Sequence, residues 1–247
     1  SEHGYKYYGF QKNLGLSRAY NYVIDRLNND EGHIIILDDD TEFDSSFIDE
    51  VLRIDNNNNS DYNDTNHIDN EYDNIDNNTH AHNHFTCVYL PIVNAKFGNE
   101  VKIISPSNLR FECTSQILNS ISEIDYNKIT AINSGMFISL SVFQSIRYNE
   151  DLFLDCIDHC FMRTVREKGM PIKLLSSKIK QSFSRGERTS LEGALHRYKL
   201  FRQDLYVYSK ICNNRLFYYA FIFKHTLINT IRYKSLAFLK LLMKSMI

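Results

Sequence analysis

The feature that most constrains the fold is a short apolar run that ends in three consecutive aspartates. Residues 33–37 read His-Ile-Ile-Ile-Leu, and Asp38, Asp39 and Asp40 follow directly. A short run rich in β-branched residues is typical of a strand buried on both faces. In open α/β sheets, ligands bind where such strands end. The run therefore predicts a buried strand whose carboxyl end carries an acidic site.

Helical patterns alternate with further short strands along the rest of the chain, which favours an α/β sheet domain. Turn signals and apolar spacing set the expected boundaries. The expected helices cover residues 16–27, 45–54, 156–168 and 191–212, and the expected strands cover residues 86–93, 101–104 and 172–183.

Composition excludes several classes of protein. Hydrophobic residues make up 43% of the 247 residues, which is too many for a wholly disordered chain. No run of 18 uncharged apolar residues is present, which argues against a transmembrane helix. The five cysteines show no CxxC spacing, so a disulfide scaffold or a zinc ribbon is not expected and a reducing compartment is.

Charge is distributed unevenly along the chain. Residues 55–84 contain eleven Asn, six Asp, one Glu and four His without any Lys or Arg, and this segment therefore contributes −7 to a net charge of −2. Its few apolar side chains cannot offset the entropy of ordering, so we expect a disordered insertion rather than a histidine metal site. Residues 205–247 instead contain seven Lys or Arg and no acidic residue. Such basic, apolar helices suit either an anionic membrane surface or packing on their own domain.

Adjacent carboxylates repel one another unless a cation neutralises them, and oxygen ligands of this kind suit Mg²⁺ or Mn²⁺. The alternative is a solvated acidic turn that caps the next helix; the position of Asp38–Asp40 after an apolar strand favours the metal site. A second acidic pair, Asp155 and Asp158, lies at a predicted helix start. One of these carboxylates could act as a general base, although acids at a helix start also simply favour its dipole.

Two segments contain glycines next to polar residues. Residues 13–21 enter the first helix, and Gly15 there permits close approach of the backbone to an anion at the helix N-terminus. This run is neither GxGxxG nor a P-loop. Residues 133–135, Asn-Ser-Gly, interrupt an apolar run, so the backbone there must bend or approach a ligand closely.

Together these segments resemble the family-2 glycosyltransferases of the GT-A fold, especially the bacterial rhamnosyltransferase-like and polysaccharide-synthesis members. Residues 13–21 are similar to the family segment N-x-G-x-[AS]-x-[AG]-x-N, and residues 34–41, IIILDDDT, resemble the strand that ends in the DxD metal motif. Residues 133–135 resemble the acceptor-side loop, and residues 148–172 resemble the F-[IF]-D-x-x-D stretch and its helix. The four motifs occur in the family order, and the resemblance runs from about Asn13 to Lys210, outside the insertion.

The resemblance implies an inverting glycosyltransferase that uses a nucleotide-diphosphate sugar together with Mg²⁺ or Mn²⁺. Asp158 would be the catalytic base, and Asp40 would coordinate the metal. The residues that would bind substrates are Asn13, Gly15, Asp38 and Asp39 for the nucleotide sugar, and Asn133, Ser134, Gly135 and Asp155 for the sugar and acceptor.

The chain departs from the family pattern at several positions. Cys160 stands where a second acidic residue is usual, Thr164 where an Arg is common, and Gln181 and Ser182 where a His is frequent. The family's first strand should precede Asn13, so we expect an N-terminally truncated chain. These departures motivate an alternative, a GT-A-fold binding or scaffold protein without turnover. A sugar nucleotidyltransferase would need a basic, Gly-rich triphosphate loop, and none is visible.

We therefore expect a GT-A domain, with a mixed central sheet flanked by helices, over residues 1–190, interrupted by the insertion at 55–84. A basic, amphipathic helical extension should cover residues 191–247. The expected partners are a nucleotide-diphosphate sugar, a glycan or lipid-linked acceptor and, peripherally, an anionic membrane, but not nucleic acid. The expected location is the cytoplasm or the inner face of the cell membrane.

Overall fold

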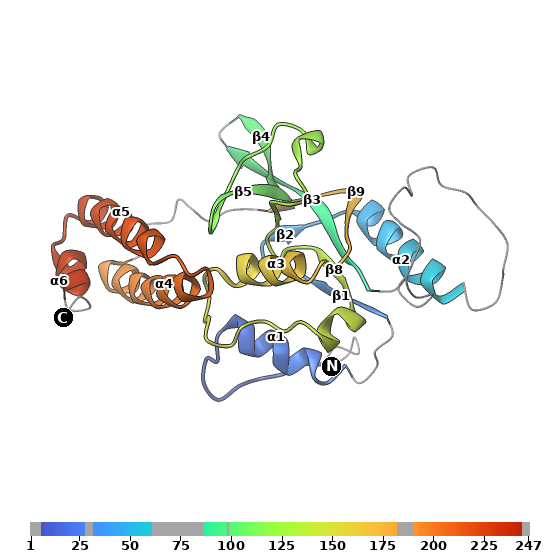
Figure 1. Cartoon of the computed structure of the whole chain (residues 1–247), viewed down its shortest axis with the longest axis horizontal. Helices are drawn as coiled ribbons and strands as arrows, with labels where there is room; N and C mark the ends of the chain where they lie inside the picture. The colour runs from blue at the N-terminus through green and yellow to red at the C-terminus, as the bar shows by residue number, and fades with distance from the viewer. Residues whose placement is uncertain (1–5, 28–31, 61–85, 98, 182–189, 244–247) are drawn as a thin grey trace. The chain divides into compact units, whose positions relative to one another are not determined.

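The structure is a computed structural model that describes residues 6–27, 32–60, 86–97, 99–181 and 190–243 (Figure 1). The chain divides into two compact units. The sheet unit comprises Leu27–Arg147 and Phe161–Gly186, and the helical unit comprises Ser1–Arg26, Tyr148–Cys160 and Glu187–Ile247. The first helix and the segment around Asp155 thus group with the C-terminal helices.

The sheet unit contains a six-stranded mixed sheet in the order β1-β8-β3-β9-β2, with β4 paired to β3. β3 and β9 are parallel and the other pairs are antiparallel, which confirms the expected mixed α/β fold class. The strands are β1 (His33–Ile36), β2 (Thr41–Glu42), β3 (Val88–Phe97), β4 (Glu100–Ser105), β8 (Met136–Ser139) and β9 (Ile172–Gln181). A second, three-stranded sheet has the order β6-β5-β7, with β5 (Ser107–Phe111), β6 (Thr114–Ser115) and β7 (Ile129–Thr130).

The central strand β3 is buried more deeply than β1. Val88, Leu90 and Val93 of β3 are completely buried, whereas β1 is mostly half-buried and Leu37, directly after it, is 42% exposed. The prediction that residues 33–37 form a strand buried on both faces is therefore wrong. The reason is position, because within the described part of the chain β1 pairs only with β8 and ends the sheet.

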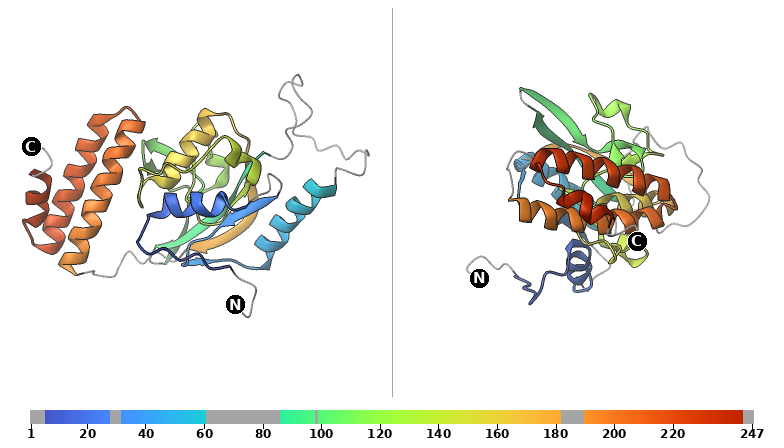
Figure 2. Two further views of the ribbon diagram at one scale, coloured as in Figure 1. Left: turned by 90° about the horizontal axis from the view of Figure 1, so that it is seen from below. Right: turned by 90° about the vertical axis from the view of Figure 1, so that its left-hand side faces the viewer.

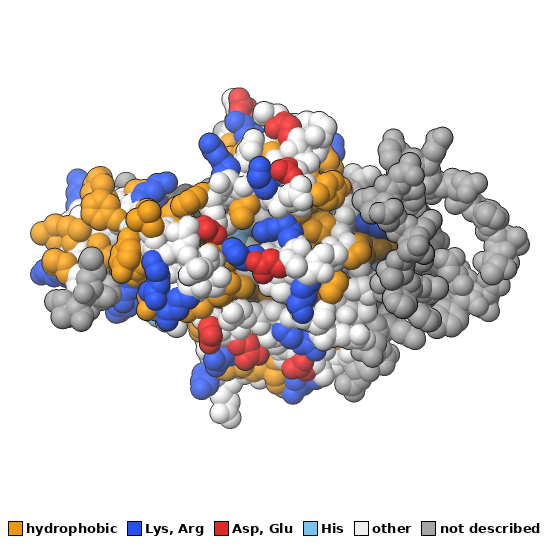
Figure 3. Space-filling view, viewed as in Figure 1, with side chains coloured by type: hydrophobic (Ala, Val, Ile, Leu, Met, Phe, Trp, Pro, Cys, Tyr) orange, Lys and Arg blue, Asp and Glu red, His pale blue; other side chains and the backbone are white. Residues whose placement is uncertain are grey.

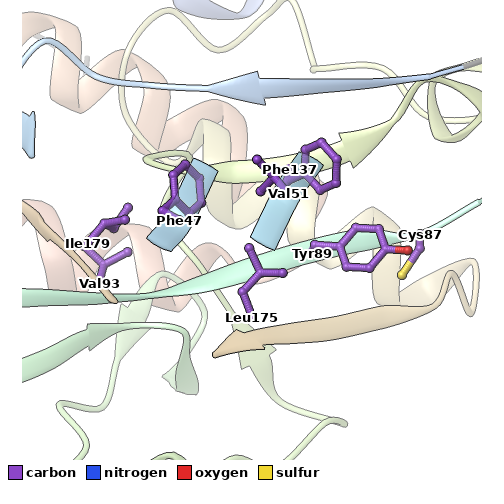
Figure 4. Packing of buried hydrophobic residues seen from close by; sticks show 8 residues of the cluster. All are labelled: Phe47, Val51, Cys87, Tyr89, Val93, Phe137, Leu175 and Ile179. Carbon is purple, nitrogen blue, oxygen red and sulfur yellow. The ribbon is translucent and has the colours of Figure 1, made fainter. Parts of the chain in front are cut away.

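Helix α2 (Ser45–Ser60) packs against the sheet through Phe47 and Val51 (Figure 4). These side chains join an apolar cluster with Tyr89, Val93 and Leu175 from β3 and β9. The helix continues six residues beyond the predicted end at 54. In α2, Asp55 Oδ1 lies 2.6 Å from His33 Nδ1 of β1, so this contact links the helix to the strand. The first residues of the predicted insertion, from Asp55 to Ser60, are therefore helical. Residues 61–84 of that insertion lie outside the described residues.

The helices α1 (Leu16–Ile24) and α3 (Ile157–Glu167) form where apolar spacing predicted them. Gly169 ends α3 in a left-handed conformation, with its N–H and that of Met170 bonded to the last turn. In the helical unit, α4 (Leu191–Ile211), α5 (Arg215–Tyr233) and α6 (Ala237–Met243) pack on one another (Figure 2). Two 3₁₀ turns cover Ile121–Glu123 and Leu140–Gln144.

Candidate functional site

Five polar residues meet where β1 ends, and we call them the carboxylate cluster. Ser134 Oγ donates a hydrogen bond to Asp38 Oδ2 at 2.6 Å. Gln181 Nε2 lies 3.3 Å from Asp38 Oδ2 and 3.2 Å from Asp40 Oδ1, so one amide group contacts both carboxylates. Thr41 Oγ1 lies 3.1 Å from Ser134 Oγ and donates to it, because the Ser134 proton is used on Asp38. The predicted metal residue and two predicted substrate residues therefore lie together.

Three strand ends bring this cluster together. After β1, the Thr41 N–H donates to the Asp38 carbonyl and turns the chain into β2. β2 pairs with the end of β9, and this register sets Thr41 opposite Gln181. The Gly135 N–H donates to the Ile36 carbonyl at 2.7 Å, which holds the turn at residues 133–135 against the end of β1. The sheet's register thus determines which side chains meet the aspartates.

Gly135 has φ +76°, and an added Cβ there would overlap Ile179 and Pro91. The expected close approach of the backbone is real, but it is made to neighbouring strands of the sheet. The neighbours of Gly135 carry the polar side chains: Ser134 is completely buried, and Asn133 is 8% exposed. Gly135 therefore allows the turn that presents Ser134 to Asp38.

The cluster has the donor types that a hard divalent cation takes. Asp38 and Asp40 supply carboxylate oxygens, and Gln181 Oε1 is buried with no hydrogen-bond partner in the described part of the chain. Among the described residues, no group of three or more His, Cys, Asp or Glu is arranged to hold a metal ion. Since Mg²⁺ is often bound by one or two carboxylates together with waters and substrate phosphates, the cluster fits such an ion. Asp39 is exposed and takes no part in these hydrogen bonds.

The other predicted acids lie in the helical unit. Asp158 is in the first turn of α3, where its Oδ1 accepts a hydrogen bond from the His159 N–H at 2.8 Å. Asp155 is engaged differently, because Arg197 of α4 binds both of its carboxylate oxygens. The hydrogen bonds that Arg197 donates to Asp155 raise the pKa of Arg197. The predicted contact of Asp155 with the acceptor would thus compete with this ion pair.

Residues 13–21 hold the segment that precedes Asp155. The Gly15 N–H donates to Asn13 Oδ1 at 2.9 Å, and an added Cβ on Gly15, at φ +82°, would overlap Phe153. Leu16 N–H donates to the Phe153 carbonyl at 2.7 Å. Asn21 is buried; its Nδ2 donates to the Tyr148 carbonyl at 2.9 Å and its Oδ1 accepts from the Tyr148 N–H at 3.1 Å. Within the helical unit, this motif therefore clamps residues 148–153.

Sequence reasoning missed the partner residues of both sites. Gln181 entered only as a departure from a family pattern, and Arg197 and Asp204 were not identified. Asp204 is completely buried and accepts hydrogen bonds from the Phe153, Leu154 and Asp155 N–H groups. The sequence does carry one signal for Asp204: this acidic residue directly precedes Leu205, which belongs to the apolar face of the predicted helix.

No curated protein and no solved structure matches the chain. A family model, described as glycosyl transferase family 2, matches residues 1–120. The match covers residues 13–21 and all three consecutive aspartates, but ends before Ser134, Asp158 and Gln181. Over just under half of the chain, the match supports a family-2 glycosyltransferase and, with it, a glycosyltransferase activity in general.

Proposed function

We propose that the protein is an inverting glycosyltransferase that moves a sugar from a nucleotide-diphosphate donor to a hydroxyl of a glycan or lipid-linked acceptor. The enzyme would take part in cell-surface polysaccharide synthesis and would act on the cytoplasmic side of the cell membrane. The observation that carries the proposal is the carboxylate cluster, in which Asp38, Asp40 and Gln181 converge at a strand end. The family match over residues 1–120 supports the reaction class.

The sheet unit would bind the donor diphosphate. Asp40, with Asp38 and Gln181 beside it, would hold Mg²⁺ or Mn²⁺. The bound ion would act as a Lewis acid on the departing diphosphate. Ser134 and Thr41 fix the Asp38 carboxylate through two successive hydrogen bonds, so its orientation is set before substrate arrives. Asp39, exposed beside them, is proposed to contact the nucleotide.

Asp158 would act as the base. As the acceptor oxygen forms its bond to the anomeric carbon, the bond from that carbon to the diphosphate oxygen breaks. The acceptor's hydroxyl proton passes to the Asp158 carboxylate, and the electron pair of the broken bond leaves with the diphosphate. General-base catalysis of this kind contributes about 10²–10⁴-fold.

Three variants test this proposal, with transfer and donor binding measured over a panel of nucleotide-diphosphate sugars in the presence of Mn²⁺. Asp40→Asn should weaken Mn²⁺ binding, because a charged oxygen ligand is lost. Asp158→Asn should lower transfer by about 10²-fold or more while donor binding is kept. Asp49→Asn, on the exposed side of α2, is the matched control and should change neither. Undiminished transfer by Asp158→Asn would remove Asp158 from the mechanism.

A binding or scaffold protein without turnover is the second candidate. The observation that favours it is the engagement of Asp155 by Arg197, which occupies a carboxylate expected at the acceptor. Calorimetric binding of donor and Mn²⁺ without transfer to any acceptor tested would support this candidate over the enzyme.

We also propose that α5 rests on an anionic membrane, where a lipid-linked acceptor would lie. Its inner face buries Phe217 and Ile222, whereas its outer face exposes an apolar stripe (Figure 3). The stripe consists of Leu216 (79% exposed), Phe223 (61%), Leu227 (48%) and Ile231 (67%). Basic residues flank it and residues 205–247 contain no acid, so its charge complements anionic lipids. No helix in the described part of the chain is long and apolar enough to span a bilayer.

Vesicle co-sedimentation tests this surface. The protein should bind vesicles of equal parts phosphatidylglycerol and phosphatidylcholine, release with salt, and bind pure phosphatidylcholine less. Phe223→Glu with Ile231→Glu should abolish binding, whereas Val101→Glu, a similarly exposed apolar position on β4, should not. Failure to bind, together with self-association that the double variant abolishes, would instead assign the stripe to a second copy of the chain.

A further inference from the structure

We propose that Asp204 of α4 is a positioning residue, which fixes the backbone that leads into Asp158. This inference rests on the proposed function, in which Asp158 is the base. Phe153 N–H donates to Asp204 Oδ1 at 2.8 Å, and the Leu154 and Asp155 N–H groups donate to Oδ2 at 2.8 and 2.7 Å. Three consecutive amides thus point at one side chain, which lies 49–51 residues away in the sequence.

A buried carboxylate is costly unless hydrogen bonds compensate its charge. Asp204 is completely buried, and the three amide groups provide that compensation. Hydrogen bonds to an ionised acceptor are roughly twice as strong as neutral ones, and a concave row of N–H groups is a recurrent anion-binding arrangement. The carboxylate therefore acts as a built-in anion that fixes the conformation of residues 153–155.

The fixed segment lies immediately before the proposed base. After Asp155, Cys156 adopts a left-handed conformation with φ +61°, and α3 begins at Ile157. A left-handed conformation is strained for a non-glycine residue and persists only where its surroundings impose it. Since one turn of backbone separates Asp155 from Asp158, release of residues 153–155 would let the first turn of α3 and the Asp158 carboxylate shift.

Arg197 adds a weaker second restraint from the same helix. It lies seven residues before Asp204, two helical turns, and its ion pair with Asp155 includes an Nη2–Oδ1 distance of 2.6 Å. The Arg197 side chain is 49% exposed, so solvent screens this pair, whereas Asp204 is shielded completely. Of the two contacts from α4, the one made by Asp204 is therefore expected to dominate.

Asp204→Asn tests the proposal, because Asn keeps the shape but places an NH₂ group against N–H donors. Asp151→Asn, an exposed acid in the same segment, is the matched control. Asp204→Asn should lower kcat for transfer by about 10-fold to 10²-fold, because misplacement of a catalytic group reduces the rate by that much. The affinity for donor nucleotide with Mn²⁺ should stay within about twofold, because the carboxylate cluster proposed to hold the metal and the donor diphosphate lies in the sheet unit. Asp204→Glu, which keeps the charge, should recover part of the loss.

Hydrogen exchange of the amides at 153–160 gives a readout that does not depend on activity. Asp204→Asn should accelerate exchange there, including at Asp158 and His159, and leave the amides of β3 unchanged. Unchanged exchange at 157–160 would refute the positioning role. Faster exchange with unchanged kcat would also overturn it. If the wild-type protein transfers no sugar, the proposed function fails, and the exchange data still decide whether Asp204 fixes the segment. Equal losses of kcat, donor affinity and β3 protection would show general unfolding and contradict the proposal.

Discussion

Replacement of Gly135 by alanine would test how the carboxylate cluster is built. Its φ of +76° lies in the left-handed region, which costs an L-residue about 1–2 kcal/mol. The new Cβ would also overlap the Ile179 side chain and Pro91, and forced overpacking typically costs about 1–3 kcal/mol. Alanine also lowers the conformational entropy of the unfolded chain, which stabilises the folded protein by about 0.4–1 kcal/mol. Gly135→Ala should therefore lower the free energy of unfolding by about 3 kcal/mol, within a range of about 1–4.6 kcal/mol.

Gly169→Ala supplies the control for the backbone contribution. Gly169 has φ +61°, and a Cβ added there meets no atom within 4 Å. Gly169→Ala should introduce only the strain of a left-handed alanine, partly offset by the lower entropy of the unfolded chain. Its free energy of unfolding should therefore fall by about 1 kcal/mol. Both free energies can be measured by urea denaturation followed by circular dichroism. Equal losses for the two variants would refute the reasoning that strand packing around Gly135 holds Ser134 against Asp38.

Three further predictions concern stability and reactivity. Burial alone would raise the pKa of Glu50, but hydrogen bonds from Ser176 and Ser177 outweigh burial and hold this pKa below 4.5. The stability that Glu50 contributes should therefore be present above pH 4.5 and lost as the pH falls through the folded-state pKa. In urea denaturation, the loss of unfolding free energy caused by Glu50→Gln should accordingly shrink in acid. Asn21→Ala removes both side-chain hydrogen bonds to the Tyr148 backbone and should cost about 2–4 kcal/mol, whereas Asn119→Ala, at an exposed site, should stay within about 0.5 kcal/mol. Burial raises the pKa of the Cys87 thiol to about 11, so mass-spectrometric mapping of native protein alkylated at neutral pH should find Cys87 unmodified and the partly exposed Cys113 and Cys212 modified first. Early labelling of Cys87 would contradict its burial.

The sequence predicts those parts of the fold that depend on local patterns. Apolar spacing located α1 and α3 to within a few residues, and the stop at Gly169 is correct. The burial of β1 was misjudged, because a run of isoleucines does not reveal whether a strand has neighbours on both sides. The end of α2 was also misjudged, since composition alone does not show that Asp55 meets His33.

The partners within each site were beyond prediction for a related reason. Gln181 reaches Asp38 and Asp40 only because β2 and β9 pair with Thr41 opposite Gln181, a register between segments about 140 residues apart. The three amides that Asp204 binds are likewise fixed by tertiary packing. A motif can suggest which residues bear the chemistry, but the residues that orient them come from distant elements whose pairing the motif does not encode.

Gly15 and Gly135 show what a glycine in such a motif does and does not indicate. Both have positive φ, and both permit close approach of the backbone, as the sequence suggested. In each case the atoms approached belong to the protein itself: Phe153 for Gly15, and Ile179 with Pro91 for Gly135. A requirement for glycine therefore does not distinguish a ligand contact from internal packing. The polar side chains of the two motifs differ in this respect, because Ser134 bonds Asp38 of the carboxylate cluster, whereas Asn21 bonds the Tyr148 backbone. Substitution of Ser134 should accordingly affect the proposed chemistry at Asp38, whereas substitution of Asn21 should act through the stability of the fold.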